Sequence, residues 1–502
     1  MRKLSIITLA LAALSSRAFS APFTAGNVVV SRVGNGAAAL SSAATVLFLD
    51  EYTPGGALVQ SLSVPTSVSG ANRRLLNSGS ATSEGTLLRS TDGAWLTFAG
   101  YDADAGTASV VGTTAAATNR VIGRVGPDGN IDTTTALNDA YSTNNIRSAI
   151  STNGTDIWLG GTGAAGTNGV RYTTYGSSTS TQLSTDVTNI RVVGIYNGQL
   201  YVSTMSGTYR GINIVGSGLP TGSGNIISLL TGFDPSNTSP QSAYGFYFSD
   251  PNTLYLGDDR TLLAGGGIQK WTFDGSIWTK QYTLTTGLTA GCRQLTGTTV
   301  LGITTLYAVH ASTQTQLVSV IDSGAGSAFT TIAASATNTA FRGVAFAPQT
   351  ASTTEGVDSY EVTEGFEISG DLNSLTASDD NYLCVFPSDA SLLAQIVFFG
   401  STAVTNPSAL SFTLEYNVQR PGLSYSLDLR RYSNGQWVNK AGGVATTADS
   451  TQVAAVTTGA NEYISANGDL AARVTWGPVN DEDPSQDGWN HCVDVAKWTL
   501  VP

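Results

Sequence analysis

The chain has 502 residues, a formal net charge of −12, and only 12% charged residues. A chain of this length is expected to form at least two domains. Its acidic balance makes nucleic acid and anionic membranes poor partners. Length and charge therefore limit the kinds of partner but do not define an activity.

The first twenty residues are expected to be a secretory signal peptide. A basic start at Arg2 and Lys3 precedes the apolar run LSIITLALAAL and a small-residue tail. Cleavage after Ser20 would also remove Arg17 and no acid, which takes the net charge from −12 to −15. A buried N-terminal strand or helix is the alternative. We expect a secreted or cell-surface protein without membrane insertion of the mature chain, and the periplasm stays open.

A repeated pattern follows the signal segment. Alternating apolar residues lead to a turn, and a stronger β run comes next, as in TLLRSTDGAWLTFAGYD (86–102), NIRSAISTNGTDIWLGGT (145–162), NIRVVGIYNGQLYVST (189–204) and AYGFYFSDPNTLYLGDD (243–259). Asn-Gly and Asp-Gly supply the positive φ angles of tight hairpins. Third and fourth β runs complete repeats of roughly 40–50 residues, which is typical of β-propeller blades.

The number of repeats predicts the number of blades. Innermost strands are expected to start near six residues: Gly85, Ile146, Ile190, Ala243, Cys292 and Phe341. The last has no second strand after it, and the N-terminus has later strands without a first, so the two ends would complete one blade. We predict a β-propeller of six blades over 22–350. Seven blades is the alternative, because the 60s to 80s and 205–240 are unassigned.

Four arginines occupy equivalent places in these repeats. Arg147, Arg191, Arg293 and Arg342 all stand at the start of an innermost strand and should surround one mouth of the central channel. Such a cationic ring could grip an anion or a sugar carboxylate. The alternative is that each arginine pairs with an acid or a carbonyl of the next blade.

Acids follow several of the predicted second strands. Asp102, Asp258 and Asp259 are the candidates for the mouth, with Asp104 beside them. A glycoside hydrolase needs two carboxylates at a set separation, and a propeller mouth can supply them. The alternative is that these loop acids satisfy turn backbone.

The repeats stop after residue 350. We expect a linker at 351–358 and a β-sandwich of jelly-roll type over 359–502, with about eight strands. Cys384 and Cys492 are expected to form a disulfide across the sandwich, with two buried thiols as the alternative. Cys292 would then stay reduced.

The second domain also holds candidate binding residues. Trp437, Trp476 and Trp489 could stack on sugar rings, with core packing as the alternative for each. The loop NDEDPSQDG contains Asp481, Asp483 and Asp487, which could bind Ca²⁺ as the one possible cofactor; a solvent-exposed acidic hairpin is the alternative.

Several stretches resemble a group of bacterial secreted proteins of unknown function. They are FTAGNVVVSRVGNG after the signal, the repeat NGQLYVS, and ALSFTLEYNVQRPGLSYSLDLRRYSNGQW with DVAKWTLVP in the second domain. The resemblance implies the two-domain fold and export but no activity. Only His310 and His491 could serve a nucleophile as a base, and there is no G-x-S-x-G motif.

Three functions remain open at this stage. The first is a non-catalytic surface or matrix protein in which a propeller scaffold carries an adhesion domain that binds a cell-surface protein. The second is binding of an extracellular polysaccharide, and the third is a propeller glycoside hydrolase or lyase. We expect a binding or structural role in preference to catalysis.

Overall fold

The computed structural model describes residues 21–501 except 235–240, 301, 313, 351–352, 389–391, 403, 405–406, 408 and 480–488. The expected signal peptide thus lies outside the described residues. The chain divides into two compact units, the first ending at Gln349 and the second beginning at Thr350. The described residues form strands and five 3₁₀ turns: η1 (Val110–Gly112), η2 (Gly207–Tyr209), η3 (Leu262–Ala264), η4 (Leu372–Leu375) and η5 (Ala460–Tyr463). None of their helices is long and apolar enough to cross a bilayer.

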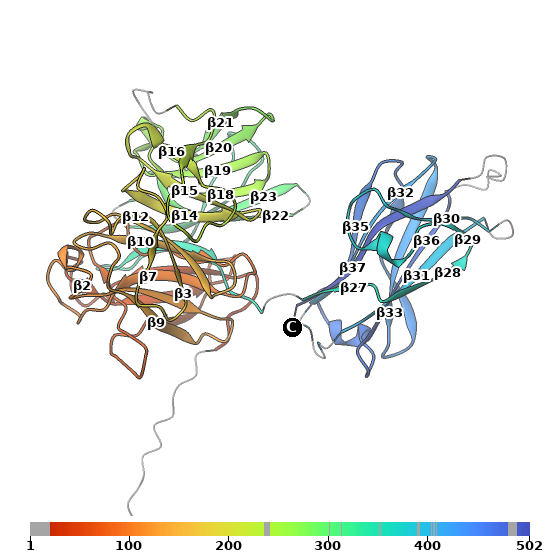
Figure 1. The fold of residues 1–502 in the computed structure, drawn as a ribbon, viewed down its shortest axis with the longest axis horizontal. Coiled ribbons are helices and arrows are strands. Elements are labelled where there is room, and N and C mark those ends of the chain that lie inside the picture. The colour runs from red at the N-terminus through yellow and green to blue at the C-terminus, as the bar shows by residue number, and fades with distance from the viewer. Residues whose placement is uncertain are drawn as a thin grey trace, which may run out of the picture. The chain divides into compact units, whose positions relative to one another are not determined.

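Figure 1 shows the strands of the first unit. Its described residues form six four-stranded antiparallel sheets. One sheet has the strand order β26 (Ala340–Phe346), β1 (Val28–Val33), β3 (Leu47–Tyr52) and β4 (Leu58–Ser63). A second has the order β6 (Leu88–Arg89), β7 (Leu96–Tyr101), β8 (Arg120–Val125) and β9 (Ile131–Leu137). A third has the order β10 (Ile146–Ser151), β11 (Asp156–Gly161), β12 (Gly169–Thr174) and β13 (Thr181–Gln182). The fourth sheet has the order β14 (Ile190–Tyr196), β15 (Gln199–Thr204), β16 (Gly211–Val215) and β17 (Ile227–Leu229). The fifth has the order β18 (Ala243–Asp250), β19 (Thr253–Asp258), β20 (Gly267–Phe273) and β21 (Trp278–Leu284). The sixth has the order β22 (Cys292–Val300), β23 (Ile303–His310), β24 (Gln316–Ile321) and β25 (Thr330–Ala334).

The first strand of each sheet contacts the first strand of the next. These contacts run from β6 through β10, β14, β18 and β22 to β26, and β26 contacts β6 again. The sheet that contains β26 is completed by the N-terminal strands β1, β3 and β4. This pairing of the two ends of the unit was predicted from the incomplete first and last repeats and is confirmed.

The segments that the repeat pattern left unassigned form strands of these six sheets or of a small two-stranded sheet. Residues 205–240 contribute β16 and β17, and β5 (Asn77–Ser78) pairs with β2 (Ala44–Thr45) as a two-stranded sheet. The described residues of this unit therefore hold six four-stranded sheets. Buried side chains of neighbouring sheets pack together, as Leu96 and Phe98 do with Ala345, because alternate residues of each strand point into the core.

The second unit consists of two antiparallel sheets. One has the order β29 (Phe366–Ser369), β30 (Leu383–Phe386), β37 (His491–Val501), β32 (Ala409–Val418) and β35 (Ser450–Val456), with β27 (Thr353–Gly356) also paired to β37. The other has the order β28 (Ser359–Glu364), β31 (Ala394–Ser401), β36 (Asp469–Pro478), β33 (Leu423–Arg431) and β34 (Gln436–Val444). Both sheets contribute to one hydrophobic core, in which Phe398 of one sheet contacts Phe412 of the other.

Part of the expected linker at 351–358 is a strand. Residues 353–356 form β27, which pairs with β37 from Leu500 back to Lys497. The eleven-residue strand β37 reaches beyond β30, so it leaves part of its edge open for β27.

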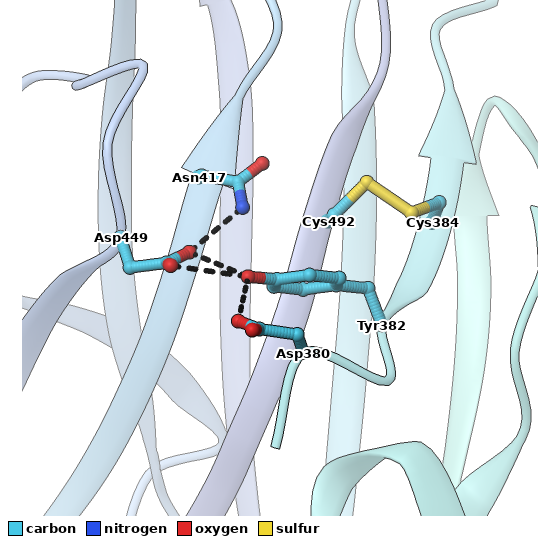
Figure 2. The surroundings of a disulfide bond; sticks show 6 residues. All are labelled: Asp380, Tyr382, Cys384, Asn417, Asp449 and Cys492. Carbon is cyan, nitrogen blue, oxygen red and sulfur yellow. Dashed lines mark hydrogen bonds between the residues drawn. A yellow bond between two sulfur atoms is a disulfide. The ribbon is translucent and has the colours of Figure 1, made fainter. Parts of the chain in front are cut away.

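The disulfide between Cys384 and Cys492 is confirmed, but its expected position is wrong. The two cysteines face each other on neighbouring strands of one sheet, β30 and β37, with Cα atoms 4.1 Å apart. The bond therefore joins strands within a sheet and does not cross the sandwich. Figure 2 shows Tyr382 beside it, with its hydroxyl donating to Asp449.

Candidate anion-binding site

A β-bulge recurs at one position in five sheets of the first unit. In each case the register between the innermost strand and its neighbour shifts just after the innermost strand begins. The residues at the shift are Arg147, Arg191, Tyr244, Arg293 and Arg342. A bulge re-aims the side chain that it carries, so five equivalent side chains are turned the same way in their sheets.

These bulges bring the four predicted arginines together around Tyr244. The guanidinium carbons of Arg191 and Arg293 lie 4.1 and 5.9 Å from the centre of its ring. Arg147 interacts electrostatically with Arg191 and Tyr244, and Arg342 does so with Arg293 and Tyr244. Four cations from four sheets thus meet at one place, which we call the arginine cluster.

Two of the arginines are held by the next sheet. Arg147 donates to the side chain of Asn189 and to the carbonyl of Ile190, 3.1 Å away. Arg191 repeats this one sheet further, donating to Ser242 Oγ at 2.8 Å and to the carbonyl of Ala243 at 3.2 Å. The alternative prediction was that each arginine pairs with an acid or a carbonyl of the next repeat. Arg147 and Arg191 do bond to a carbonyl of the next repeat, and both also belong to the arginine cluster.

Arg342 is the most buried member, with 7% exposure. Its Nη2 donates to the carbonyl of Gly79 at 2.7 Å, and its Nε has no partner among the described residues. Burial first, and the nearby Arg293 second, lower its pKa to about 10. Gly85 makes room for it, because a Cβ there would lie 2.7 Å from that of Arg342.

Arg147 also has a hydrogen-bond donor that the described residues leave unpaired. Its Nε is buried without a partner among the described residues, and burial lowers its pKa. Buried donors without a partner are uncommon in native proteins. The cluster therefore holds donor capacity that the surrounding protein leaves unused.

Two carboxylates border the arginine cluster. Asp259 accepts from Arg293 Nε at 3.1 Å and from Ser242 Oγ at 2.6 Å, and so links Arg293 to the hydroxyl that Arg191 contacts. Glu84 is 2% exposed, and burial raises its pKa. Since four guanidinium groups face two carboxylates, the cluster keeps an excess of positive charge within an acidic protein.

Glu84 is fully engaged by its neighbours. Its Oε1 accepts from the Tyr101 hydroxyl and the Asn145 amide, each at 2.5 Å, and its Oε2 accepts from the backbone of Ser78 at 2.9 Å. These bonds fix the carboxyl group in place. Its position beside the arginines suits a structural counter-charge.

The other predicted acids are not in the cluster. Asp102 pairs with Arg74 at 2.7 Å, and Arg74 also contacts Asp104. Asp258 is fully buried and pairs with Arg260 at 2.7 Å. Only Asp259 of the three candidates lies beside the predicted arginines, so the structure does not assemble the expected set of mouth acids.

The predicted sugar-stacking tryptophans are mostly core residues. Trp476 and Trp489 are 0% and 1% exposed, so stacking on a ligand is wrong for both. They point between the sheets, where Trp476 stacks on His491 with ring centres 4.0 Å apart. Trp437 on β34 is half-buried, and the guanidinium carbon of Arg473 lies 4.8 Å from its ring centre.

The predicted calcium ligands Asp481, Asp483 and Asp487 lie outside the described residues. Elsewhere, within the part of the chain that the structure describes, no three His, Cys, Asp or Glu side chains group as metal ligands.

Sequence reasoning missed Tyr244 and Glu84. Tyr244 follows Ala243 as Arg147 follows Ile146, so aligning the starts of the innermost strands places a tyrosine in the arginine position of one repeat. Glu84 directly precedes Gly85, the predicted start of another. The signal was present in the register of the repeats.

No family model and no curated protein matches the chain. Among solved structures, it is similar to a putative 6-phosphogluconolactonase from Bacteroides uniformis, with 9% identity and a TM-score of 0.32 over 85% of this chain and 99% of the other. An exo-β-1,3-galactanase from Phanerochaete chrysosporium has 10% identity and a TM-score of 0.30 over 94% and 100%. A family 29 carbohydrate-binding module from Piromyces equi has 11% identity and a TM-score of 0.19 over 30% and 90%.

Proposed function

We propose that the protein binds a carboxylate-bearing saccharide at the arginine cluster and acts as an exported binding protein. In this proposal the six sheets are the blades of a β-propeller that β26 closes with β1, and the two-sheet unit is a jelly-roll-type sandwich. The disulfide is compatible with an oxidising compartment outside the cytoplasm.

One observation carries the proposal. Four arginines and a tyrosine stand at the same bulge in five sheets, and the Nε atoms of Arg147 and Arg342 have no partner among the described residues. Guanidinium groups bind carboxylates through paired hydrogen bonds. An anion would supply the missing acceptors and the missing negative charge together.

A saccharide acid fits the cluster better than a simple anion. Tyr244 is half-buried and adds an aromatic side chain between the cations. Aromatic rings pack against the C–H faces of sugars. A uronate ring presents such a face beside its carboxylate.

Binding is favoured over catalysis by the state of the nearby acids. Asp259 is bonded to Arg293, and both oxygens of Glu84 accept hydrogen bonds from protein groups. A general acid or base must be free to exchange a proton with the substrate. Asp259 instead bonds to Arg293, and Glu84 places a carboxyl group near Arg147 and Arg342.

Calorimetric titration of the whole protein with trigalacturonate tests the proposal. Galactotriose, the neutral counterpart, is the matched ligand control. Wild-type protein should bind trigalacturonate and not galactotriose, with an affinity that falls as salt rises. Arg191→Met should weaken trigalacturonate binding at least tenfold.

Arg74→Met is the matched protein control, since Arg74 lies in the same unit but pairs with Asp102 outside the cluster. It should leave the affinity unchanged. Equal affinity of wild type and Arg191→Met, or no binding of trigalacturonate, would refute the proposed function.

A further inference from the structure

A cavity lies between the sheet that contains β14 and the sheet that contains β18. Its volume is about 290 Å³, close to the lower end of the roughly 300–1,000 Å³ found for small-molecule sites. Aromatic residues dominate its lining: Tyr196, Tyr201, Phe248, Phe273 and Trp278.

This cavity is separate from the arginine cluster. Strand β14 begins at Ile190, next to Arg191, and ends at Tyr196 on the cavity. At about 3.3 Å per residue, its two ends lie roughly 20 Å apart. The two sites therefore occupy opposite ends of the same strands.

Phe248 is the centre of the aromatic lining. The Tyr196 ring stacks on it at 4.8 Å with planes 17° apart, the Tyr201 ring lies 4.9 Å away, and Trp278 meets it edge-on at 5.9 Å. Rings that pack on one another in this way hold their positions without a ligand. Ring packing within the protein therefore sets the shape of the cavity.

Polar groups at the cavity remain available. The Tyr201 hydroxyl and the Trp278 indole N–H have no hydrogen-bond partner among the described residues, and the Tyr196 hydroxyl lies beside the Asn197 amide. Burial raises the pKa of both Tyr196 and Tyr201, so both hydroxyls stay protonated donors. They would suit hydroxyl or ether oxygens of a ligand.

The described residues that line the cavity include no charged side chain. A charged ligand would lose its hydration without compensation there. A purely apolar ligand would leave the phenol and indole donors unpaired, which costs free energy. A neutral sugar ring has both the apolar C–H face and the oxygen acceptors that this lining calls for.

We propose that this cavity binds a neutral pyranose unit of a saccharide. This site is distinct from the arginine cluster, so it goes beyond the proposed function and does not depend on it. Ligand-observed NMR on the whole protein, with glucan, galactan, mannan and xylan hexamers as probes, tests it.

Tyr201→Phe removes one hydroxyl and keeps the ring packing. It should weaken binding of the recognised hexamer at least fivefold, and Trp278→Leu should abolish it. Tyr175→Phe is the matched control, because Tyr175 lies elsewhere and bonds to Asp132. Arg191→Met should also leave this affinity unchanged, which separates the result from failure at the arginine cluster.

Two outcomes would overturn the proposal. One is that no hexamer binds, or that a bound hexamer is unaffected by Tyr201→Phe. The other is that para-cresol binds while every hexamer fails, which would make the cavity an apolar pocket.

Discussion

The guanidinium carbon of Arg191 lies 4.1 Å from the centre of the Tyr244 ring. Tyr244 occupies in its sheet the bulge position that arginine occupies in four others. A fifth arginine there would meet four like charges. The tyrosine instead offers its electron-rich face to a cation, which stabilises the arrangement.

Replacement of Tyr244 by leucine tests this role. The variant keeps a bulky side chain but loses the ring between the cations. We expect its free energy of unfolding to fall by about 1 kcal/mol at low salt. Urea unfolding at two salt concentrations measures this, and the loss should shrink at high salt because screening weakens the repulsion between arginines. The same loss at both concentrations would contradict the electrostatic role.

Arg342 and Arg120 allow a comparison of two buried arginines. Arg120 is 0% exposed and donates to several acceptors, including the carbonyls of Tyr141 and Thr118. Arg342 donates one side-chain hydrogen bond, to the carbonyl of Gly79, and its Nε has no partner among the described residues. We expect Arg120→Met to cost about 3 kcal/mol, since it leaves buried carbonyls unpaired.

Arg342→Met should change the free energy of unfolding by less than about 1 kcal/mol, in either direction, because little bonding is lost. It should nevertheless weaken trigalacturonate binding. Chemical unfolding of both variants gives the comparison. A large loss of stability in Arg342→Met would show that the arginine serves the fold and not a ligand.

His491 should make stability depend on pH. Burial lowers its pKa to about 3, and its ring stacks on Trp476 with neither nitrogen bonded to a described residue. The unfolded chain, with a histidine pKa near 6.5, binds the proton more readily. The contribution of the neutral His491 ring to the free energy of unfolding is therefore complete above pH 6.5 and falls as the pH drops toward 3.

At pH 4.5 the loss should reach about 2–3 kcal/mol. His491→Phe keeps a planar ring on Trp476 and cannot titrate. The difference in unfolding free energy between variant and wild type should grow in favour of the variant from pH 7 to 4.5. Parallel pH curves would contradict the buried neutral histidine.

Cys292 should be inert in the folded protein. It is the free cysteine of the described chain, it is fully buried, and burial raises its pKa to about 12. A thiol reagent that reacts with thiolates should find none at pH 8 before unfolding. In denaturant one thiol should react without reductant, and three should react after reduction. Rapid reaction of the native protein would show that this strand opens readily.

The repeats made the first unit readable from sequence. Turn residues between the strands of a repeat fix hairpins locally, as Asn197-Gly198 does between β14 and β15. The starts at Ile146, Ile190, Ala243 and Cys292 were predicted to the residue. The arginines could be placed because they share one register. The β-bulge that orients these arginines could not be predicted, because it depends on how the innermost strand pairs with the neighbouring strand.

The second unit was harder to predict. Trp437 and Trp476 both lie in β-strands, whose successive side chains point to opposite faces of the sheet. The sequence of a strand does not show which of the two faces packs against the other sheet. Strand β27 pairs with β37 across more than 140 residues of sequence. The partner of Cys384 was correct, but its place on an adjacent strand depends on the same long-range pairing.

A crystal structure of the protein with trigalacturonate would show whether a carboxylate binds at the arginine cluster. We expect a carboxylate within hydrogen-bonding distance of the Nε atoms of Arg147 or Arg342, with a sugar ring against Tyr244. A saccharide bound elsewhere, with the arginine cluster empty at saturating ligand, would contradict it.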